Sequence, residues 1–263
     1  NKLFGGPPRD SESEITQKEM DLAASVQQIT EKIVINLARN IAKETGHSNL
    51  CLAGGVALNC VANGTLHREK LFNNIWIQPS AGDAGGSLGA ALNIHYSMLN
   101  NPRIVNKNDS MKGSYLGPKF ENNKIIEQLK SSGAIFHVLE NNALIKKVAE
   151  LLSTGSAVGW FSGRMEFGPR SLGARSIIAD SRSSSMQKML NLKIKYRESF
   201  RPFAPSVLSE DASEWFNLSG ASPYMLIVAD VNEDKRVDVK EIDSELFGIE
   251  KLNIARSKIP AVT

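Results

Sequence analysis

The chain has 263 residues, 41% of them apolar, which is enough for one large or two modest domains with buried cores. Its formal net charge of +3 gives no overall argument for a nucleic-acid or membrane partner. The sequence has no run of 18 apolar residues and no signal-peptide or lipidation pattern, so we expect a soluble, cytoplasmic protein. Cys51 and Cys60 are too few for a disulfide framework, and we interpret both as small buried side chains in a reducing compartment.

The first hundred residues predict helices that alternate with strands. Apolar residues recur every three or four positions between Ile15 and Glu44, and Gly46 supplies a stop. We expect these residues to form one continuous apolar helix face: Leu22, Val26, Ile29, Ile33, Leu37 and Ile41. Predicted strands Leu50–Ala53 and Ile75–Ile77 then alternate with predicted helices Val56–Glu69 and Ala84–Leu99. This order predicts an α/β domain with a largely parallel sheet.

A polar, aperiodic stretch at residues 100–114 predicts a linker, because connections of this length are uncommon inside one domain. We therefore divide the chain into residues 1–104, a linker at 105–114 and a second mixed α/β domain at 115–263. The predicted elements of that second domain are a short strand near Tyr115, a helix over 122–132, a strand Ile135–Leu139, a helix Ala143–Ser153 and a strand Ala157–Phe161.

Two glycine-rich turns in the first domain are candidate ligand sites. Gly54 and Gly55 follow a predicted strand and open a helix, a geometry that lets a phosphate or ribose approach the backbone closely. A plain strand-to-helix turn also uses such glycines. Asp83 lies where the next strand gives way to a helix, and it is either an N-cap or a carboxylate for a metal or nucleotide.

A basic segment gives the strongest signal. Residues 164–201 contain nine cations and three acids, a local charge of +6, with glycines and prolines beside an apolar strand. A solvated basic face would explain the charge but not the glycines. Because the planar guanidinium pairs with phosphate oxygens, a polyanionic ligand such as a nucleotide or acyl phosphate fits better. The four histidines have no metal-ligand spacing, and serine-hydrolase, P-loop and Rossmann motifs are absent from the sequence.

The sequence resembles the nodulation-factor and antibiotic O-carbamoyltransferases. The matching stretches are Leu3–Arg9, Leu50–Asn59, Gln78–Leu92, Gly159–Ile178 and Phe200–Val207. The resemblance implies the C-terminal half of an actin-like (RNase H-like) ATPase domain over residues 1–104, followed by a YrdC-like domain over 115–263. Because the chain opens without methionine and stops without a terminal signal, we expect a fragment that lacks the N-terminal part and is truncated at its C-terminus.

The resemblance also implies a two-step reaction. The YrdC-like domain makes carbamoyl-adenylate from carbamoyl phosphate and ATP, and the actin-like domain passes the carbamoyl group to a hydroxyl of a small-molecule or glycan acceptor. The family pattern assigns catalysis to Arg164, Arg170, Lys193 and Arg197. It assigns substrate or nucleotide binding to Gly54, Gly55, Asn59, Arg175, Lys195 and Arg201.

Asp83 matches the family's metal aspartate, for iron or another divalent ion such as magnesium. The family's paired histidine ligands have no counterpart here, so we expect no bound metal in this chain and no complete transfer. The acceptor and the oligomeric state stay open. Two alternatives remain: a basic module that binds RNA or nucleotides, and a relative of the hydrogenase maturation factors that carbamoylates a protein cysteine.

Overall fold

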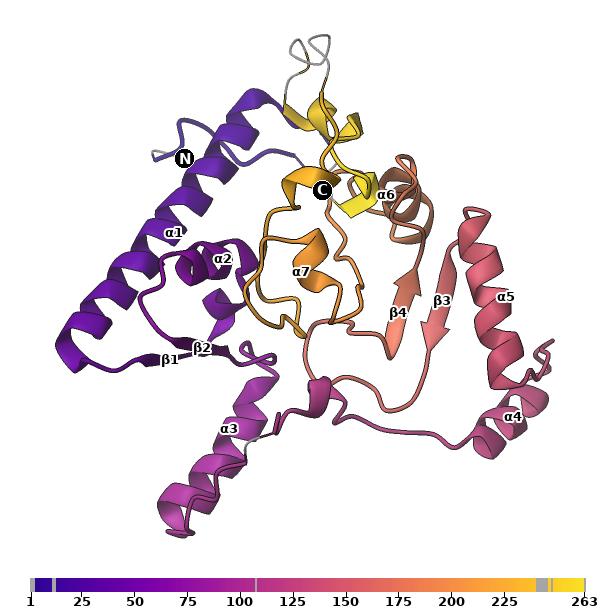
Figure 1. Cartoon of the computed structure of the whole chain (residues 1–263), viewed down its shortest axis with the longest axis horizontal. Helices are drawn as coiled ribbons and strands as arrows, with labels where there is room; N and C mark the ends of the chain where they lie inside the picture. Colours follow the sequence, from indigo (N-terminus) through magenta and orange to yellow (C-terminus); the bar gives the residue numbers. More distant parts are fainter. Residues whose placement is uncertain (1–2, 11–12, 107, 240–245, 247, 263) are drawn as a thin grey trace.

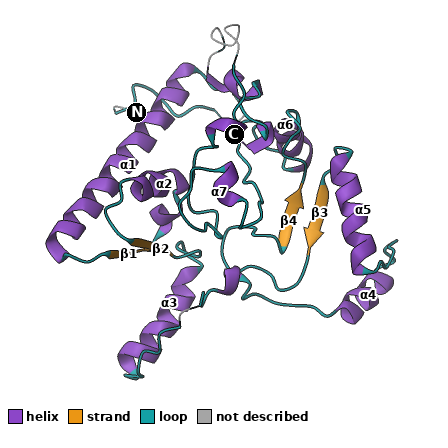
Figure 2. Cartoon of the chain, viewed as in Figure 1, coloured by secondary structure: helices purple, strands orange, loops and turns teal. Residues whose placement is uncertain are grey.

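The computed structural model describes residues 3–10, 13–106, 108–239, 246 and 248–262 and shows a mixed α/β fold (Figures 1 and 2). Its main elements are α1 (Gln17–Thr45), β1 (Asn49–Leu52), α2 (Cys60–Arg68), β2 (Asn74–Ile77), α3 (Gly85–Asn93), α4 (Asn122–Ser131), α5 (Asn141–Ser153), β3 (Val158–Phe161), β4 (Arg175–Ile178), α6 (Met186–Met189) and α7 (Ala212–Trp215). Among the described helices, none combines the length and apolar character needed to cross a membrane.

Helix α1 begins and ends where its sequence signals lie. Thr16 is the N-cap, and its backbone N–H donates to the Glu19 carboxylate over 2.9 Å, as in a capping box. Gly46 ends the helix in the left-handed region with φ of 64°, and its N–H donates to the carbonyl of Ala42. The predicted helix is therefore confirmed, with bounds shifted by one or two residues.

The face of α1 that packs in the structure is not the continuous apolar face that the periodicity marks. Val26, Ile29, Ile33, Leu37 and Ile41 are 43–56% exposed. The buried residues are Ile35 and Ala38, which pack with Leu50, Leu66 and Phe72. Leu66 of α2 packs against this second face, whereas the periodicity of the sequence marks a face that is largely exposed.

Strands β1 and β2 pair in parallel, with Leu50 opposite Ile75 and Leu52 opposite Ile77, which confirms the predicted parallel pairing. Each strand is followed by a turn and a helix, α2 and α3 respectively. Because the strands are parallel, both turns lie at the same edge of the sheet. Helix α3 continues as a π-helical segment, Ile94–Met98, and projects from the body of the molecule (Figure 1).

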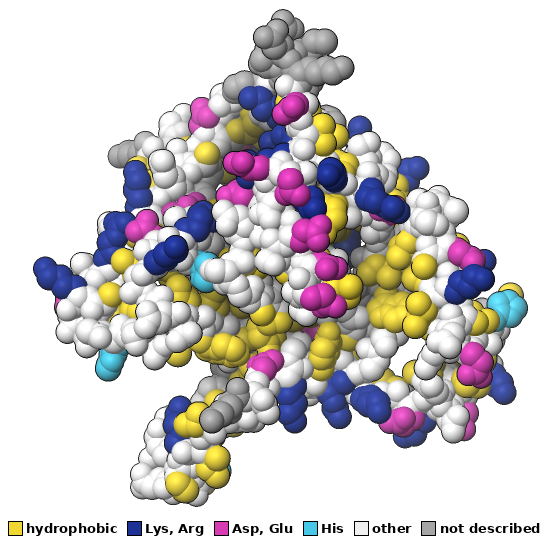
Figure 3. Space-filling view, viewed as in Figure 1, with side chains coloured by type: hydrophobic (Ala, Val, Ile, Leu, Met, Phe, Trp, Pro, Cys, Tyr) yellow, Lys and Arg dark blue, Asp and Glu magenta, His cyan; other side chains and the backbone are white. Residues whose placement is uncertain are grey.

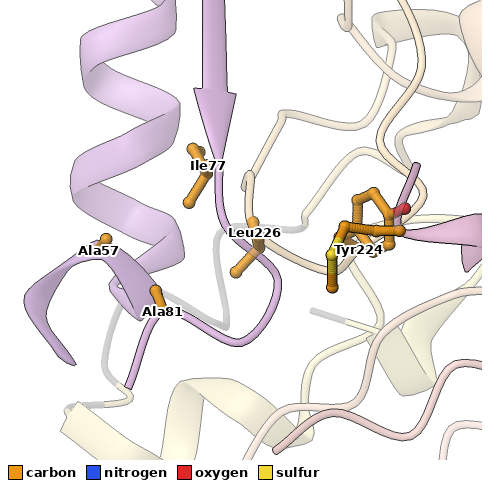
Figure 4. Close-up of a cluster of buried hydrophobic side chains, with 6 residues drawn as sticks. Ala57, Ile77, Ala81, Tyr224 and Leu226 are labelled. Carbon is orange, nitrogen blue, oxygen red and sulfur yellow. The ribbon is translucent and has the colours of Figure 1, made fainter. Parts of the chain in front are cut away.

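The core at this edge is shared between the two halves of the chain. Ala57, Ile77 and Ala81 pack with Tyr224 and Leu226 (Figure 4), and Met111 belongs to the same cluster.

Two further contacts hold residues 224–228, called the returning segment below, on α2. The Asn63 side-chain amide donates to the carbonyls of Ala57 and Leu226, over 2.8 and 2.9 Å, and the Val228 N–H donates to the carbonyl of Cys60 over 3.1 Å. Residues 224–228 therefore complete the packing around β1, β2 and α2.

The stretch predicted as a linker is anchored at its end. The Asp109 carboxylate accepts hydrogen bonds from the N–H groups of Met111 and Gly113, both over 2.9 Å, and from the Tyr224 hydroxyl. Burial alone would raise the pKa of Asp109, but the donors from Tyr224 and Gly113 lower it. Burial and the neighbouring carboxylate raise the pKa of Tyr224, so the hydroxyl keeps its proton.

The second half departs more from prediction. Strands β3 and β4 form an antiparallel hairpin, with Val158 opposite Ile178, and β4 was not predicted. The predicted strands near Tyr115 and at Ile135–Leu139 are wrong: Tyr115 follows a 3-10 turn, and residues 134–139 have no regular structure. Ile135 is 98% exposed, so its apolar side chain does not pack against a neighbouring strand.

Cys51 is exposed and Cys60 half-buried, so the expectation of two buried thiols is also wrong.

Gly64 gives a direct test of the shared core. A Cβ on Gly64 would lie 2.3 Å from the Val228 carbonyl oxygen, so we expect Gly64→Ala to displace residues 224–228 and to lower the free energy of unfolding by about 2 kcal/mol or more. Urea denaturation followed by circular dichroism measures the change.

Gly89→Ala is the matched control, because Gly89 also lies in a helix but has open space around its Cβ position. It should raise the free energy of unfolding by up to about 1 kcal/mol. Equal effects of the two substitutions would contradict the close contact with Val228.

Candidate functional site

The glycine turns at the carboxyl ends of β1 and β2 lie together. Residues 53–58 follow β1 and contain a 3-10 turn, Gly55–Leu58, and residues 78–84 follow β2. The Gly54 N–H donates to the carbonyl of Ala81 over 2.8 Å, which ties the two turns to each other. Gly54 has φ of 94°, a conformation that favours glycine.

The loop between β3 and β4, residues 162–174, reaches this edge and is called the basic loop below. The Ser80 hydroxyl donates to the carbonyl of Phe167 over 2.8 Å. Gly168 packs so closely there that a Cβ would lie 2.7 Å from the Ser80 oxygen. One Arg170 nitrogen, Nη2, donates to the carbonyl of Leu58 over 3.0 Å. Two motifs more than 100 residues apart in sequence thus form one site.

A second set of contacts holds the basic loop against residues 114–118. The Phe167 N–H donates to the carbonyl of Ser114 over 2.6 Å, and the Met165 N–H donates to that of Pro118 over 3.0 Å. Arg164 is exposed, and its Nη1 donates to the carbonyl of Gly117 over 2.6 Å. The loop is therefore supported from two sides.

A buried carboxylate fixes the loop from within. The Glu166 side chain is fully buried and accepts hydrogen bonds from the N–H groups of Leu172 and Ala174, over 2.7 and 2.8 Å. It also forms an ion pair with Arg175, with 2.9 Å between Oε2 and Nε. Burial alone would raise the pKa of Glu166, but Arg175 and the backbone donors lower it to about 2. The carboxylate therefore stays ionised at neutral pH.

The other candidate cations form a second group around α6 and the π-helical segment Leu190–Ile194. The Arg197 Nε donates to the buried Asn191 side chain over 2.7 Å, and its guanidinium lies 5.2 Å from the centre of the Phe203 ring. Arg201 pairs with Glu198 over 2.9 Å. Lys193 and Lys195 are exposed. Figure 3 likewise shows Lys and Arg side chains spread over several parts of the visible face.

Asn59 and Asp83 have different surroundings. The Asn59 oxygen caps α2 by accepting from the Ala62 N–H over 3.0 Å, and its amide group donates to Gln27 over 2.9 Å. Its polar atoms are thus already engaged within the chain. Asp83 is exposed and does not cap α3, whose N-cap is Ala84. Within the described residues, no group of three or more His, Cys, Asp or Glu side chains is placed to hold a metal ion.

Sequence reasoning missed the residues that hold this site together. Glu166 was counted only as an acid within a basic segment, and its ion pair with Arg175, nine residues later, was not predicted. Ser80 and the Asp109–Tyr224 pair carried no signal, because their partners are 87 and 115 residues distant in the sequence.

Comparisons with known proteins identify both halves of the chain. Residues 2–92 match the family model for the carbamoyltransferase N-terminus, and residues 149–263 match that for the carbamoyltransferase C-terminus.

Curated proteins are also similar to this chain. The uncharacterized protein sll1178 of Synechocystis is 58% identical over 99% of this chain and 43% of its own length. The nodulation protein NolO of Bradyrhizobium diazoefficiens is 42% identical over 84% of this chain and 40% of its own. Nodulation protein U of Sinorhizobium fredii is 34% identical over 78% of this chain and 35% of its own. The chain therefore spans less than half the length of these relatives.

The ionised Glu166 predicts a specific dependence of stability on pH. Its pKa is about 2 in the folded chain and near its ordinary 4.5 when unfolded, so its contribution of about 3 kcal/mol is fully present above pH 4.5. That contribution is lost as the pH falls from 4.5 towards 2. We expect Glu166→Gln to lower the free energy of unfolding at pH 7 by about 3 kcal/mol and to flatten this part of the pH profile.

Urea denaturation between pH 7 and 3 measures both effects. Glu121→Gln, which removes an exposed partner of Lys119, is the control and should change the free energy of unfolding by less than about 1 kcal/mol. Parallel pH profiles for the wild type and Glu166→Gln would show that Glu166 does not carry the acid dependence.

Proposed function

Because the chain belongs to the carbamoyltransferase family, we propose that it acts in the ATP-dependent transfer of a carbamoyl group from carbamoyl phosphate to a hydroxyl of a small-molecule or glycan acceptor. In this proposal residues 1–104 supply part of an actin-like transfer domain and residues 115–263 supply part of a YrdC-like domain that forms carbamoyl-adenylate.

One observation carries the proposal: the basic loop, from the region matching the C-terminal model, docks on the strand edge of the region matching the N-terminal model. A two-step transfer needs its phosphate-handling and acceptor-handling parts close together, because the carbamoyl-adenylate made in the first step must reach the second without hydrolysis. The contacts at Ser80 and Leu58 support the proposal because they join these two regions of the chain.

The proposed chemistry balances with one water. Water attacks carbamoyl phosphate to release phosphate and carbamate, and a carbamate oxygen then attacks the α-phosphorus of ATP and expels pyrophosphate. The acceptor hydroxyl attacks the carbamoyl carbon, AMP leaves with the bridging oxygen, and the hydroxyl proton passes to solvent. Negative charge builds on oxygen in each step, and cations held in fixed positions stabilise it.

The proposed roles follow the two groups of cations. Lys193, Lys195, Arg197 and Arg201 hold the triphosphate and carbamoyl phosphate, with Arg164 contributing from the basic loop and Arg175 from the start of β4. The Arg175 charge is already compensated by Glu166, so its share is mainly to keep the loop in place. Gly54 and Gly55 flank the nucleotide in the transfer half, whereas Asn59 supports that turn through its cap on α2.

A resident metal does not fit the described residues. Divalent metals in proteins take several ligands, and Asp83 is an exposed carboxylate without further candidate ligands grouped around it in the described ranges. No step above passes through a metal.

Binding of ATP tests the proposal. We expect ATP to bind the chain with a Kd below about 1 mM, measured by isothermal titration calorimetry. Arg197→Gln should weaken binding about tenfold or more, because a hydrogen bond to a charged group is worth about 1.5–3 kcal/mol. Arg182→Gln is the matched control, since Arg182 is an exposed arginine that pairs with Asp180, and it should leave the Kd unchanged.

Competition with a short RNA separates the alternative. An RNA-binding module would prefer the RNA, lose affinity steeply with salt and depend little on adenosine. Absence of saturable ATP binding by folded wild-type protein would refute the nucleotide-handling role.

A further inference from the structure

Arg170 lacks a carboxylate partner among the described residues, as do Arg164 and Arg197, and of these three it alone has a buried nitrogen without a hydrogen-bond partner there. Arg175, Arg182 and Arg201 each pair with a carboxylate, over 2.7–2.9 Å. Within the described residues, Arg170 has only the Leu58 carbonyl as a hydrogen-bond acceptor. A carbonyl satisfies one donor but leaves the positive charge uncompensated.

Burial makes this charge costly. Arg170 is half-buried, and its Nε lies buried without a hydrogen-bond partner in the described part of the chain. A desolvated guanidinium with unused donors is unfavourable unless an anion compensates it. The contacts of the basic loop at Ser80 and Ser114 hold Arg170 there despite this cost. An unfavourable arrangement of this kind, which the surrounding structure holds in place, is typical of a binding site.

The turn that Arg170 contacts borders open space. Leu58, its acceptor, ends the 3-10 turn that begins at Gly55. A Cβ on either Gly54 or Gly55 would meet no atom within 4 Å, so the backbone of this turn borders open space. Parallel strands end here and helices begin, which is where α/β sheets bind phosphate-bearing ligands. The Arg170 guanidinium, which lacks a carboxylate partner among the described residues, is thus joined to the glycine turn by its hydrogen bond to Leu58.

We infer that Arg170 and the Gly54–Leu58 turn form a composite site for the phosphate of a nucleoside monophosphate, with the guanidinium supplied by one family region and the turn by the other. The inference rests on the proposed function, in which that phosphate belongs to carbamoyl-adenylate during the transfer step. Arg170 then acts on the adenylate, not on the triphosphate held by Arg197. When the bond from the carbamoyl carbon to the bridging oxygen breaks, the electron pair moves onto this phosphate, and Arg170 stabilises it.

Glu166 is the positioning residue for this site. Its carboxylate binds Leu172, Ala174 and Arg175, so residues 166–175 keep one loop conformation with Arg170 near its middle. Gly168 sets the distance to Ser80, since a side chain there would collide with the hydroxyl.

Titration of AMP into the ¹⁵N-labelled chain, followed by amide NMR, tests the inference. In the wild type we expect saturable shifts of the Gly54 and Gly55 amide signals. Arg170→Gln should weaken the apparent affinity about tenfold or more. Arg170→Lys, which keeps the charge but loses the planar fork, should give an intermediate loss. Arg39→Gln, which removes an exposed partner of Glu69, is the control and should leave the shifts unchanged.

Each outcome decides between the two proposals. Equal AMP affinity in the wild type and both Arg170 variants, or no shift of Gly54 and Gly55 in the wild type, overturns the composite site. If ATP still shifts signals of residues 190–201 in that case, the proposed function stands without it. If Arg170→Gln lowers the melting temperature, Arg170→Lys carries the comparison, and an affinity equal to wild type then refutes the role of the guanidinium.

Discussion

The ionised, fully buried carboxylate of Glu166 is the constraint on which the candidate site depends. Its hydrogen bonds to Leu172, Ala174 and Arg175 convert a glycine-rich loop into a fixed structure. Ordering a glycine-rich loop costs considerable backbone entropy, and these hydrogen bonds offset that cost. Because those bonds form inside one short segment, the loop can keep its shape while its outer surface contacts two other parts of the chain.

The two halves of the chain are joined by polar contacts as well as by apolar packing. Arg170 and Ser80 connect the basic loop to the turns after β1 and β2, and Tyr224 connects the returning segment to Asp109. Hydrogen bonds fix the distance and direction between the two halves. The apolar cluster around Ala57 and Leu226 supplies most of the free energy that holds the halves together. Relative movement of the halves would break both kinds of contact.

Local sequence signals predicted what local interactions determine. Apolar periodicity and Gly46 placed α1, and the alternation of apolar runs placed the parallel β1–β2 pair. The face of α1 that packs was not predictable, because Ile35 and Ala38 are selected by α2 and not by the helix itself. The apolar run at Ile135 looked like a strand, but pairing with a neighbour is a property of the whole fold.

The candidate site shows the same division. Periodicity and composition identified the glycine turns and the basic segment separately. Their meeting depends on the contact between Arg170 and Leu58, 112 residues apart, which no local pattern encodes.

The returning segment has a consequence for biosynthesis. Leu226 follows its partner Asn63 by 163 residues, which at ordinary rates of translation corresponds to about 8 to 30 seconds. During that interval the nascent chain already contains Ala57, Ile77 and Ala81 but not the residues that cover them. For this topology, the apolar surface of these residues therefore lacks its native cover from residues 224–228 until that segment has been synthesised.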